Sequence, residues 1–141
     1  MRIATAHPDC PFCEAVRTEE PLARRGTFVA RYDSYPVSRG HVLLIPRRHI
    51  ATFFELNRNE RSDFFNLLLE VRDILHHQFQ PDGFNIGVNV GPAAGQTIMH
   101  LHVHVIPRYA GDVEHPEGGV RNILPNLAQY LPNADTQTSA S

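Results

Sequence analysis

The feature that most constrains the fold of this chain is a row of three histidines. His100, His102 and His104 are each separated by one apolar residue, so the pattern has a period of two. Side chains two positions apart share one face of a β-strand, whereas a helix would scatter these imidazoles around its axis. The β-branched residues of this run, Val103, Val105 and Ile106, also favour a strand. We therefore predict a strand that presents three imidazoles on one exposed face and ends at Pro107.

Three interpretations of this histidine row are open from the residues alone. The row could be a solvated polar face with no chemical role. Two of its imidazoles could bind a catalytic zinc and leave a position for water. Alternatively, because the pKa of imidazole is about 6.5, a neutral histidine could act as nucleophile or base. Gly95, Gln96 and Thr97 precede the row and could place N–H groups and a hydroxyl around a phosphate.

The two cysteines of the chain are Cys10 and Cys13. This spacing supplies half of a tetrahedral zinc site, but it could also be a redox pair or chance. No βαβ pattern supports the redox interpretation. Candidate partners for a zinc are His49 and one histidine of the row. We interpret the remaining histidines as ordinary surface or packing residues: His7, His41, His76, His77 and His115.

The rest of the chain predicts one long helix and several strands. Asn57 is a suitable N-cap with Glu60 as its reciprocal partner, and apolar residues at helical spacing continue to Phe79. Pro81 and Gly83 then stop the helix. Apolar or alternating runs predict strands over 27–32, 41–46 and 84–90, and the last should pair antiparallel with the histidine strand.

Composition limits the class of protein. The chain has 141 residues, of which 42% are hydrophobic, and this is enough for one compact domain. Its net charge of −2 argues against a surface that binds nucleic acid through bulk charge. No apolar run approaches the roughly 20 residues of a membrane span, so we expect a cytoplasmic protein. We predict one domain over 1–131 and a disordered polar tail over 132–141.

The chain resembles the histidine triad (HIT) superfamily. The row matches its His-φ-His-φ-His-φ-φ signature, where φ is an apolar residue. The sequence from Gly95 to Arg108 is most similar to the dinucleoside polyphosphate hydrolase branch. This resemblance implies an α+β fold with about five antiparallel strands, one long helix, one short helix and a homodimer. Further motifs follow in the family's order across about residues 10–108: the cysteine pair, Gly40–Pro46, the long helix, Asn89-x-Gly91 and Gly95-Gln96-Thr97.

The resemblance also implies roles for single residues. His102 would be the nucleophile, attacking the α-phosphorus to form a nucleotidyl-histidine that water hydrolyses. His104 would position or protonate the leaving group. Contacts to phosphate or ribose would come from six residues: Asp33, Asn89, Gly95, Gln96, Thr97 and His104.

A zinc site follows from the same resemblance. In relatives with a Cys-x-x-Cys pair the first histidine of the triad is a zinc ligand, whereas in metal-free relatives it orients the nucleophile region. The implied site here is Cys10, Cys13, His49 and His100. Four protein ligands leave no position for water, so this zinc would be structural and the mechanism would need no catalytic metal.

The expected function is therefore a nucleotide hydrolase or transferase, with a purine nucleotide on one side. Diadenosine tetraphosphate and triphosphate are the first choice of substrate. Four alternatives stay open: an adenosine phosphoramidase that cleaves a P–N bond, a phosphorolytic variant, a zinc-stabilised nucleotide-binding module with little turnover, and a zinc hydrolase using the three histidines. Arg121 could reach a distal phosphate or be an ordinary surface residue.

Overall fold

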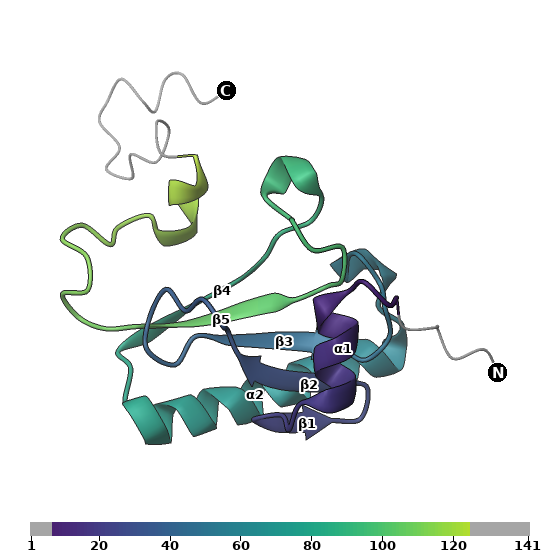
Figure 1. Ribbon diagram of the computed structural model, residues 1–141. Coiled ribbons are helices and arrows are strands. Elements are labelled where there is room, and N and C mark those ends of the chain that lie inside the picture. The colour runs from purple at the N-terminus through teal and green to yellow at the C-terminus, as the bar shows by residue number, and fades with distance from the viewer. Residues whose placement is uncertain (1–6, 125–141) are drawn as a thin grey trace. The chain divides into compact units, whose positions relative to one another are not determined.

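The computed structural model describes residues 7–124, which fall into two compact units, 7–109 and 110–124 (Figure 1). The first unit holds five strands and two α-helices. The second contains a 3-10 helix, η3 (Gly119–Ile123), which carries Arg121. Within the described residues no helix is long and apolar enough to cross a membrane. The single domain over 1–131 and the homodimer stay predictions, and the predicted tail, 132–141, lies outside the described residues.

The five strands form one antiparallel sheet in the order β1-β2-β3-β5-β4, which confirms the predicted α+β class. Strands β4 and β5 pair antiparallel from Gly83↔Arg108 to Val88↔Val103, as predicted. Strand β1 was not predicted, because its three residues carry no alternating pattern. The bounds are β1 (Ala23–Arg25), β2 (Phe28–Tyr32), β3 (Val42–Pro46), β4 (Gly83–Val88) and β5 (Val103–Arg108).

The long helix, α2 (Arg58–Phe79), begins and ends where the sequence indicates. The Asn57 side chain accepts from the N–H of Glu60 at 2.9 Å, and the Glu60 carboxylate accepts from the N–H of Asn57 at 3.0 Å. The helix ends at Gln80, which has a left-handed φ of +51°. The other helices are short: α1 (Pro11–Thr18), η1 (Phe53–Glu55) and η2 (Pro92–Ala94).

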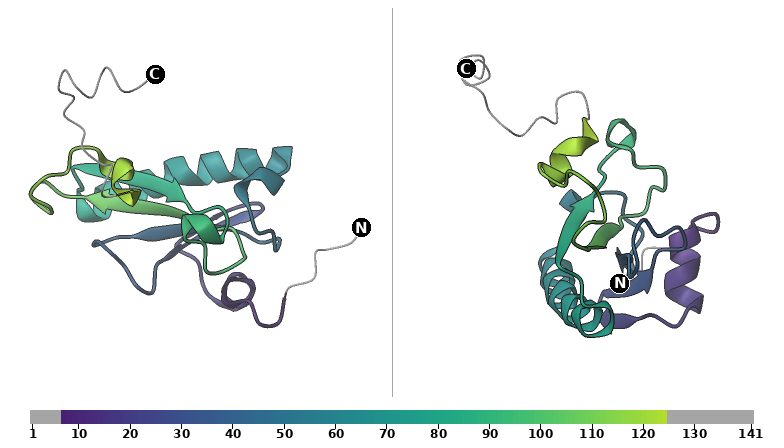
Figure 2. Two further views of the ribbon diagram at one scale, coloured as in Figure 1. Left: turned by 90° about the horizontal axis from the view of Figure 1, so that it is seen from above. Right: turned by 90° about the vertical axis from the view of Figure 1, so that its left-hand side faces the viewer.

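The two α-helices cover opposite faces of the sheet (Figure 2). Alternate residues of β2 and β3 point to opposite sides. One set packs with Leu67, Val71 and Leu75 of α2 in the larger core. The other set consists of Val29, Leu43 and Ile45. These residues pack with Phe12 and Cys13 of α1 in a smaller core. The smaller core places α1 on the face that carries the functional residues.

The predicted histidine strand needs two corrections. Strand β5 begins only at Val103, and His100 is fully buried, so the three imidazoles do not form one exposed face. Pro107 lies inside the strand and does not end it. The pairing of β5 with β3 reaches only Val105. On that side of β5, Pro107 therefore faces no partner strand, and its missing N–H costs no hydrogen bond of the sheet.

Candidate functional site

Four side chains from separate parts of the chain meet in a largely buried group, which we call the Cys/His cluster. Cys10 is the N-cap of α1, and Cys13 lies in the first turn of that helix. His49 follows β3 and His100 precedes β5. Their ligand atoms all lie within 4.8 Å of one another, and both cysteines are free thiols. The cluster therefore joins α1 to the segment that leads into β5.

The Cys/His cluster has the dimensions of a tetrahedral metal site. Nδ1 of His100 lies 3.4 Å from each cysteine Sγ, and Nδ1 of His49 lies 3.2 Å from both His100 Nδ1 and Cys13 Sγ. Zinc bonds of about 2.3 Å to sulfur and about 2.1 Å to nitrogen place tetrahedral ligands about 3.4–3.8 Å apart. Burial raises the pKa of the Cys13 thiol, and a bound cation would offset that penalty. The donor set fits a zinc ion.

The ring of His100 is fixed on both sides. Its Nε2 lies 2.8 Å from the carbonyl oxygen of Pro46. A carbonyl can only accept, so Nε2 carries the proton and Nδ1 presents its lone pair to the cysteines. Burial lowers the pKa of His100 to about 4, which keeps the imidazole neutral, as a metal ligand must be.

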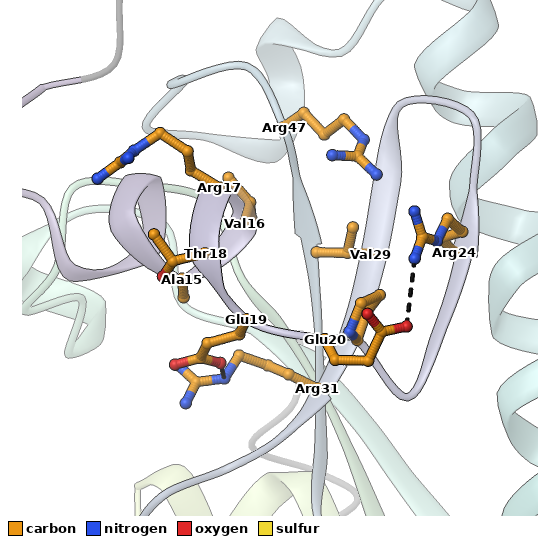
Figure 3. A pocket seen from close by; sticks show the side chains of 11 residues that line it. Ala15, Val16, Arg17, Thr18, Glu19, Glu20, Arg24, Val29, Arg31 and Arg47 are labelled. Carbon is orange, nitrogen blue, oxygen red and sulfur yellow. Dashed lines mark hydrogen bonds and ion pairs between the residues drawn. The ribbon is translucent and has the colours of Figure 1, made fainter.

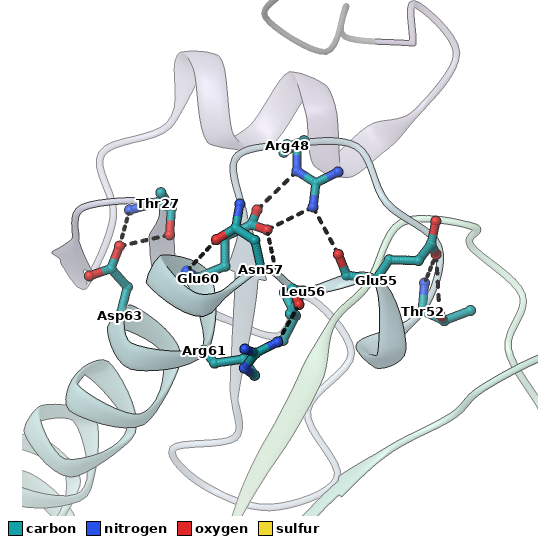
Figure 4. A network of polar contacts seen from close by, with 9 residues as sticks. All are labelled: Thr27, Arg48, Thr52, Glu55, Leu56, Asn57, Glu60, Arg61 and Asp63. Atoms are coloured by element: carbon teal, nitrogen blue, oxygen red, sulfur yellow. Dashed lines mark hydrogen bonds and ion pairs between the residues drawn. The ribbon is translucent and has the colours of Figure 1, made fainter.

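A second set of contacts anchors the segment that carries His49 to the start of α2 (Figure 4). The guanidinium of Arg48 donates to both carboxylate oxygens of Glu60, at 3.1 and 2.7 Å, and to the carbonyl of Glu55. Burial alone would raise the pKa of Glu60, but hydrogen bonds from Arg48 and Asn57 lower it overall. This bidentate pair, whose Glu60 side is buried, fixes Arg48 and so positions the neighbouring His49.

His102 is held in one defined tautomer. Its Nδ1 lies 2.8 Å from the carbonyl oxygen of His100, so Nδ1 carries the proton. Nε2 is left as an unprotonated nitrogen with its lone pair available. Phe12 of α1 packs against the ring, with 4.8 Å between the ring centroids. The site therefore presents one imidazole in the form that nucleophilic attack requires.

His104 is held by a chain of hydrogen bonds that begins in the β2–β3 loop. The backbone N–H of Val37 donates to Nδ1 of His41 at 3.1 Å, so the His41 proton is on Nε2. This Nε2 lies 2.9 Å from Nδ1 of His104, and the proton of His104 must therefore be on its own Nε2. Oδ2 of Asp33 lies 3.4 Å from His41 and 4.0 Å from His104.

The electrostatic surroundings keep both imidazoles neutral. Burial, then the neighbouring His102 and His41, lowers the pKa of His104 to about 4, against the opposing effect of Asp33. Burial also lowers the pKa of His41, again opposed by Asp33. At neutral pH the Nε2–H of His104 is thus a hydrogen-bond donor. Within residues 7–124, the hydrogen bond of this ring is made by Nδ1 and leaves Nε2–H available to a ligand.

His41 is the functional candidate that the sequence analysis missed. We interpreted it as an ordinary surface or packing residue, but it is 3% exposed and uses both ring nitrogens. The available signal was its place at the edge of a wholly apolar strand, where a buried polar ring needs a partner. Sequence spacing could not show that the partner is His104, 63 positions away.

Asp33, His41 and His104 are the second group in residues 7–124 whose donor atoms could surround a cation. Their hydrogen bonds argue against one. Nδ1 of His41 already accepts from Val37, so a metal on Nε2 would require an imidazolate. The zinc hydrolase built on the whole histidine row is disfavoured as well, because His100 and His104 belong to separate groups.

The loop between β4 and β5 carries the predicted phosphate contacts. Gly91 and Gly95 have φ of +86° and +94°, which favour glycine. Gln96 is 4% exposed: its Oε1 accepts from the N–H of Gly91, and its Nε2 donates to the carbonyls of Ala51 and Ile98. The Gln96 side chain therefore holds the loop together, and its contact with phosphate stays a prediction.

Asn89, at the start of this loop, and Thr97, within it, are both exposed. The side chain of Asn89 borders Gly95, and Asn89 directly follows β4, at the level where His102 precedes β5. Thr97 lines a pocket beside the Cys/His cluster. Asn89 and Gly95 therefore lie near each other at the start of β5, next to His102, whereas Thr97 lies beside the Cys/His cluster.

We expect Gln96→Ala to destabilise the fold by about 2–4 kcal/mol, because it leaves three partly buried backbone groups, on Ala51, Gly91 and Ile98, without their partners. The exposed Gln78 on α2 provides a matched control, and Gln78→Ala should cost about 0.5 kcal/mol or less. Urea unfolding of the two variants measures both values. Equal stabilities would show that the hydrogen bonds of Gln96 do not hold the loop.

The comparison with known families agrees with the fold and the histidine row. The HIT domain matches residues 16–111, which is more than half of the chain. The chain therefore belongs to the HIT family, and the predicted resemblance is confirmed.

Named relatives lie within the same family. An uncharacterized HIT-like protein of Methanocaldococcus jannaschii is 34% identical over 118 residues, covering 81% of this chain and 91% of that protein. AP-4-A phosphorylase of Mycobacterium tuberculosis is 34% identical over 114 residues, covering 77% of this chain and 58% of that enzyme. The asymmetrical bis(5′-nucleosyl)-tetraphosphatase of Schizosaccharomyces pombe is 39% identical over 77 residues, covering 55% of this chain and 42% of that enzyme.

A solved structure bears on the Cys/His cluster. The zinc-bound histidine triad family protein of Mycobacterium smegmatis superposes with a TM-score of 0.66 at 26% identity, covering 93% of this chain and 87% of that one. The fold is therefore found in a zinc-bound protein, and the cluster of this chain has the donors and distances to hold a metal.

Proposed function

We propose that this chain is a nucleotide hydrolase that attacks the α-phosphate of a dinucleoside polyphosphate through His102. The observation that carries the proposal is the hydrogen bond between Nδ1–H of His102 and the carbonyl of His100. It fixes the tautomer whose Nε2 is unprotonated and nucleophilic. The relatives named AP-4-A phosphorylase and bis(5′-nucleosyl)-tetraphosphatase support the substrate class.

The reaction would take two steps. Nε2 of His102 forms a bond to the α-phosphorus while the P–O bond to the leaving nucleotide breaks, and the electron pair leaves with that oxygen. The ring becomes cationic, and the carbonyl of His100 stabilises it by accepting from Nδ1–H. Water then attacks the same phosphorus and releases one proton to solvent, the P–N bond breaks with its electron pair returning to Nε2, and a nucleoside monophosphate leaves a neutral His102.

His104 would act beside the nucleophile as a donor. Its Nε2–H, set by the bond from His41, would donate to a phosphate oxygen and help the leaving group depart. Asn89 and the N–H groups of the loop at Gly95 would contact further phosphate oxygens, with Thr97 at its end. Asp33 would contact the ribose. The Cys/His cluster would hold a structural zinc that keeps His100, and so its carbonyl, in place.

A second candidate uses inorganic phosphate in place of water. The similarity to AP-4-A phosphorylase favours it, since the same nucleotidyl-histidine could be attacked by either acceptor. A phosphoramidate, whose leaving group is an amine, would also use the same nucleophile.

The test is turnover of diadenosine tetraphosphate, diadenosine triphosphate and adenosine phosphoramidate by the full chain, with and without inorganic phosphate. Hydrolysis of the tetraphosphate gives AMP and ATP, whereas phosphorolysis gives ADP and ATP, so the products separate the two acceptors. Binding of AMP without turnover of any of the three substrates would indicate a nucleotide-binding module and overturn the proposal.

We expect His41→Phe to lower kcat by about 10- to 100-fold, because a ring without a donor cannot set the tautomer of His104. His41→Gln is the matched control, since its amide N–H can donate from nearly the same position. That variant should keep most of the activity. Steady-state kinetics of the two variants measure the effect, and equal losses in both would show that His41 acts only by packing.

A further inference from the structure

The catalytic face of the sheet continues beyond the triad toward β2. Arg31 of β2 pairs with Leu43 of β3, and Leu43 pairs with His104 of β5. These three residues therefore form one row across the sheet, on the face that α1 covers. Two strand spacings separate Arg31 from His104 by about 10 Å. The ribose and base of a nucleotide held at His102 can span that distance.

A pocket of about 350 Å³ lies at this end of the row, between α1 and the β1–β2 side of the sheet (Figure 3). Glu19, at the end of α1, and Arg31 line it, with Oε2 of Glu19 3.1 Å from Nε of Arg31. Ala15 and Val29 are among the apolar residues that line it. The pocket thus combines apolar side chains with one acceptor and one donor.

The pocket contains four arginines, but its charge is largely neutralised. Arg31 pairs with Glu19, Arg24 pairs with Glu20, and Arg17 pairs with Glu14 outside the lining. The fourth, Arg47, donates to the carbonyl of Gly26. With most of the guanidinium charge already compensated, the pocket suits a neutral, hydrogen-bonding group better than a free anion.

Arg31 has an unused donor. Its Nε is buried and makes no hydrogen bond, because the nearby Glu19 oxygen lies off the N–H direction. A buried donor without an acceptor is costly, and a ligand acceptor would satisfy it. The side chain of Glu19 is 46% exposed, so its carboxylate can also accept from a ligand.

We propose that Glu19 and Arg31 recognise the edge of the nucleobase and make the enzyme prefer guanine over adenine. The proposal rests on the proposed function, because it places the base of the nucleotide that His102 attacks. Guanine offers N1–H and N2–H to the carboxylate of Glu19 and O6 to the guanidinium of Arg31. Adenine offers that carboxylate only its N6–H₂ group, so one hydrogen bond is lost and one carboxylate lone pair has no donor.

The experiment compares kcat/KM for diguanosine and diadenosine tetraphosphate in the wild type, Glu19→Gln and Glu20→Gln. We expect the wild type to favour the guanine substrate by about tenfold or more. Glu19→Gln replaces an acceptor by an amide, the group that suits adenine, and should abolish or reverse the ratio. Glu20→Gln changes the neighbouring exposed pair with Arg24 in the same pocket and should leave the ratio unchanged.

The ratio of the two substrates is independent of how much folded enzyme a variant yields. Turnover of neither substrate by the wild type would overturn the proposed function itself. Turnover of both with equal kcat/KM, or an unchanged ratio in Glu19→Gln, would overturn the assignment of Glu19 and Arg31 while the proposed hydrolase stands. Equal shifts in both glutamate variants would show a general charge effect of the pocket and would also overturn it.

Discussion

Replacing His102 with alanine is expected to lower the hydrolysis of diadenosine tetraphosphate by about 10⁴-fold or more. The reason is chemical rather than structural. The fixed tautomer gives His102 the available Nε2, whereas the nitrogens of His100 face the Cys/His cluster and Pro46. No other imidazole of the row can replace it. The measurement is kcat under saturating substrate, with products separated by anion exchange.

Two observations would accompany that loss. His102→Ala should still bind AMP, because phosphate and ribose contacts come from other residues. Quenching the wild type during turnover with alkaline denaturant, in which a P–N bond to histidine survives, should trap a phosphorus-labelled protein that the variant does not form. His77→Ala, an exposed change on α2, is the control and should keep full activity. If His104→Ala lost the label while His102→Ala kept it, the nucleophile would be His104.

The sequence was sufficient to predict the elements that depend on local pattern. The capping pair of Asn57 and Glu60, the helical stripe and the alternation after His102 each specify a structure within a few residues. The Cys10 and Cys13 spacing is local too, since both sulfurs lie in one turn at the start of α1. The predicted zinc ligands meet in the structure, but only the two cysteines share a local motif, and tertiary packing brings His49 and His100 to them.

What the sequence could not predict depends on tertiary contacts. The burial of His100 follows from its place between α1 and β3, which alternation along one strand does not reveal. The role of His41 depends on the register of two strands, and that of Gln96 on the carbonyl of Ala51, 45 positions away. Strand β1 is held in the sheet by its pairing with β2 rather than by its own composition. Long-range contacts decided each of these cases.

Removal of the metal is the second change with a large expected effect. We expect the purified chain to contain one zinc ion and Cys13→Ser to bind none tightly. Zinc held at about a thousand times its Kd stabilises a fold by about 4 kcal/mol, so the variant should unfold about 10–15 °C below the wild type. Metal analysis and calorimetry measure the two quantities. The mutation removes one of the two thiols through which α1 contacts His49 and His100.

The time course of chelation separates a structural zinc from a catalytic one. Because the cluster offers four protein ligands, a chelator should remove activity slowly, at the rate at which the metal-free chain unfolds. Well below the unfolding temperature, kcat should fall only modestly, since Pro46 still holds the ring of His100 and the carbonyl of His100 still orients His102. Immediate and complete loss of kcat in a chain that remains folded would show that the metal is catalytic. The closed geometry of Cys10, Cys13, His49 and His100 predicts the opposite, because no ligand position is left for substrate or water.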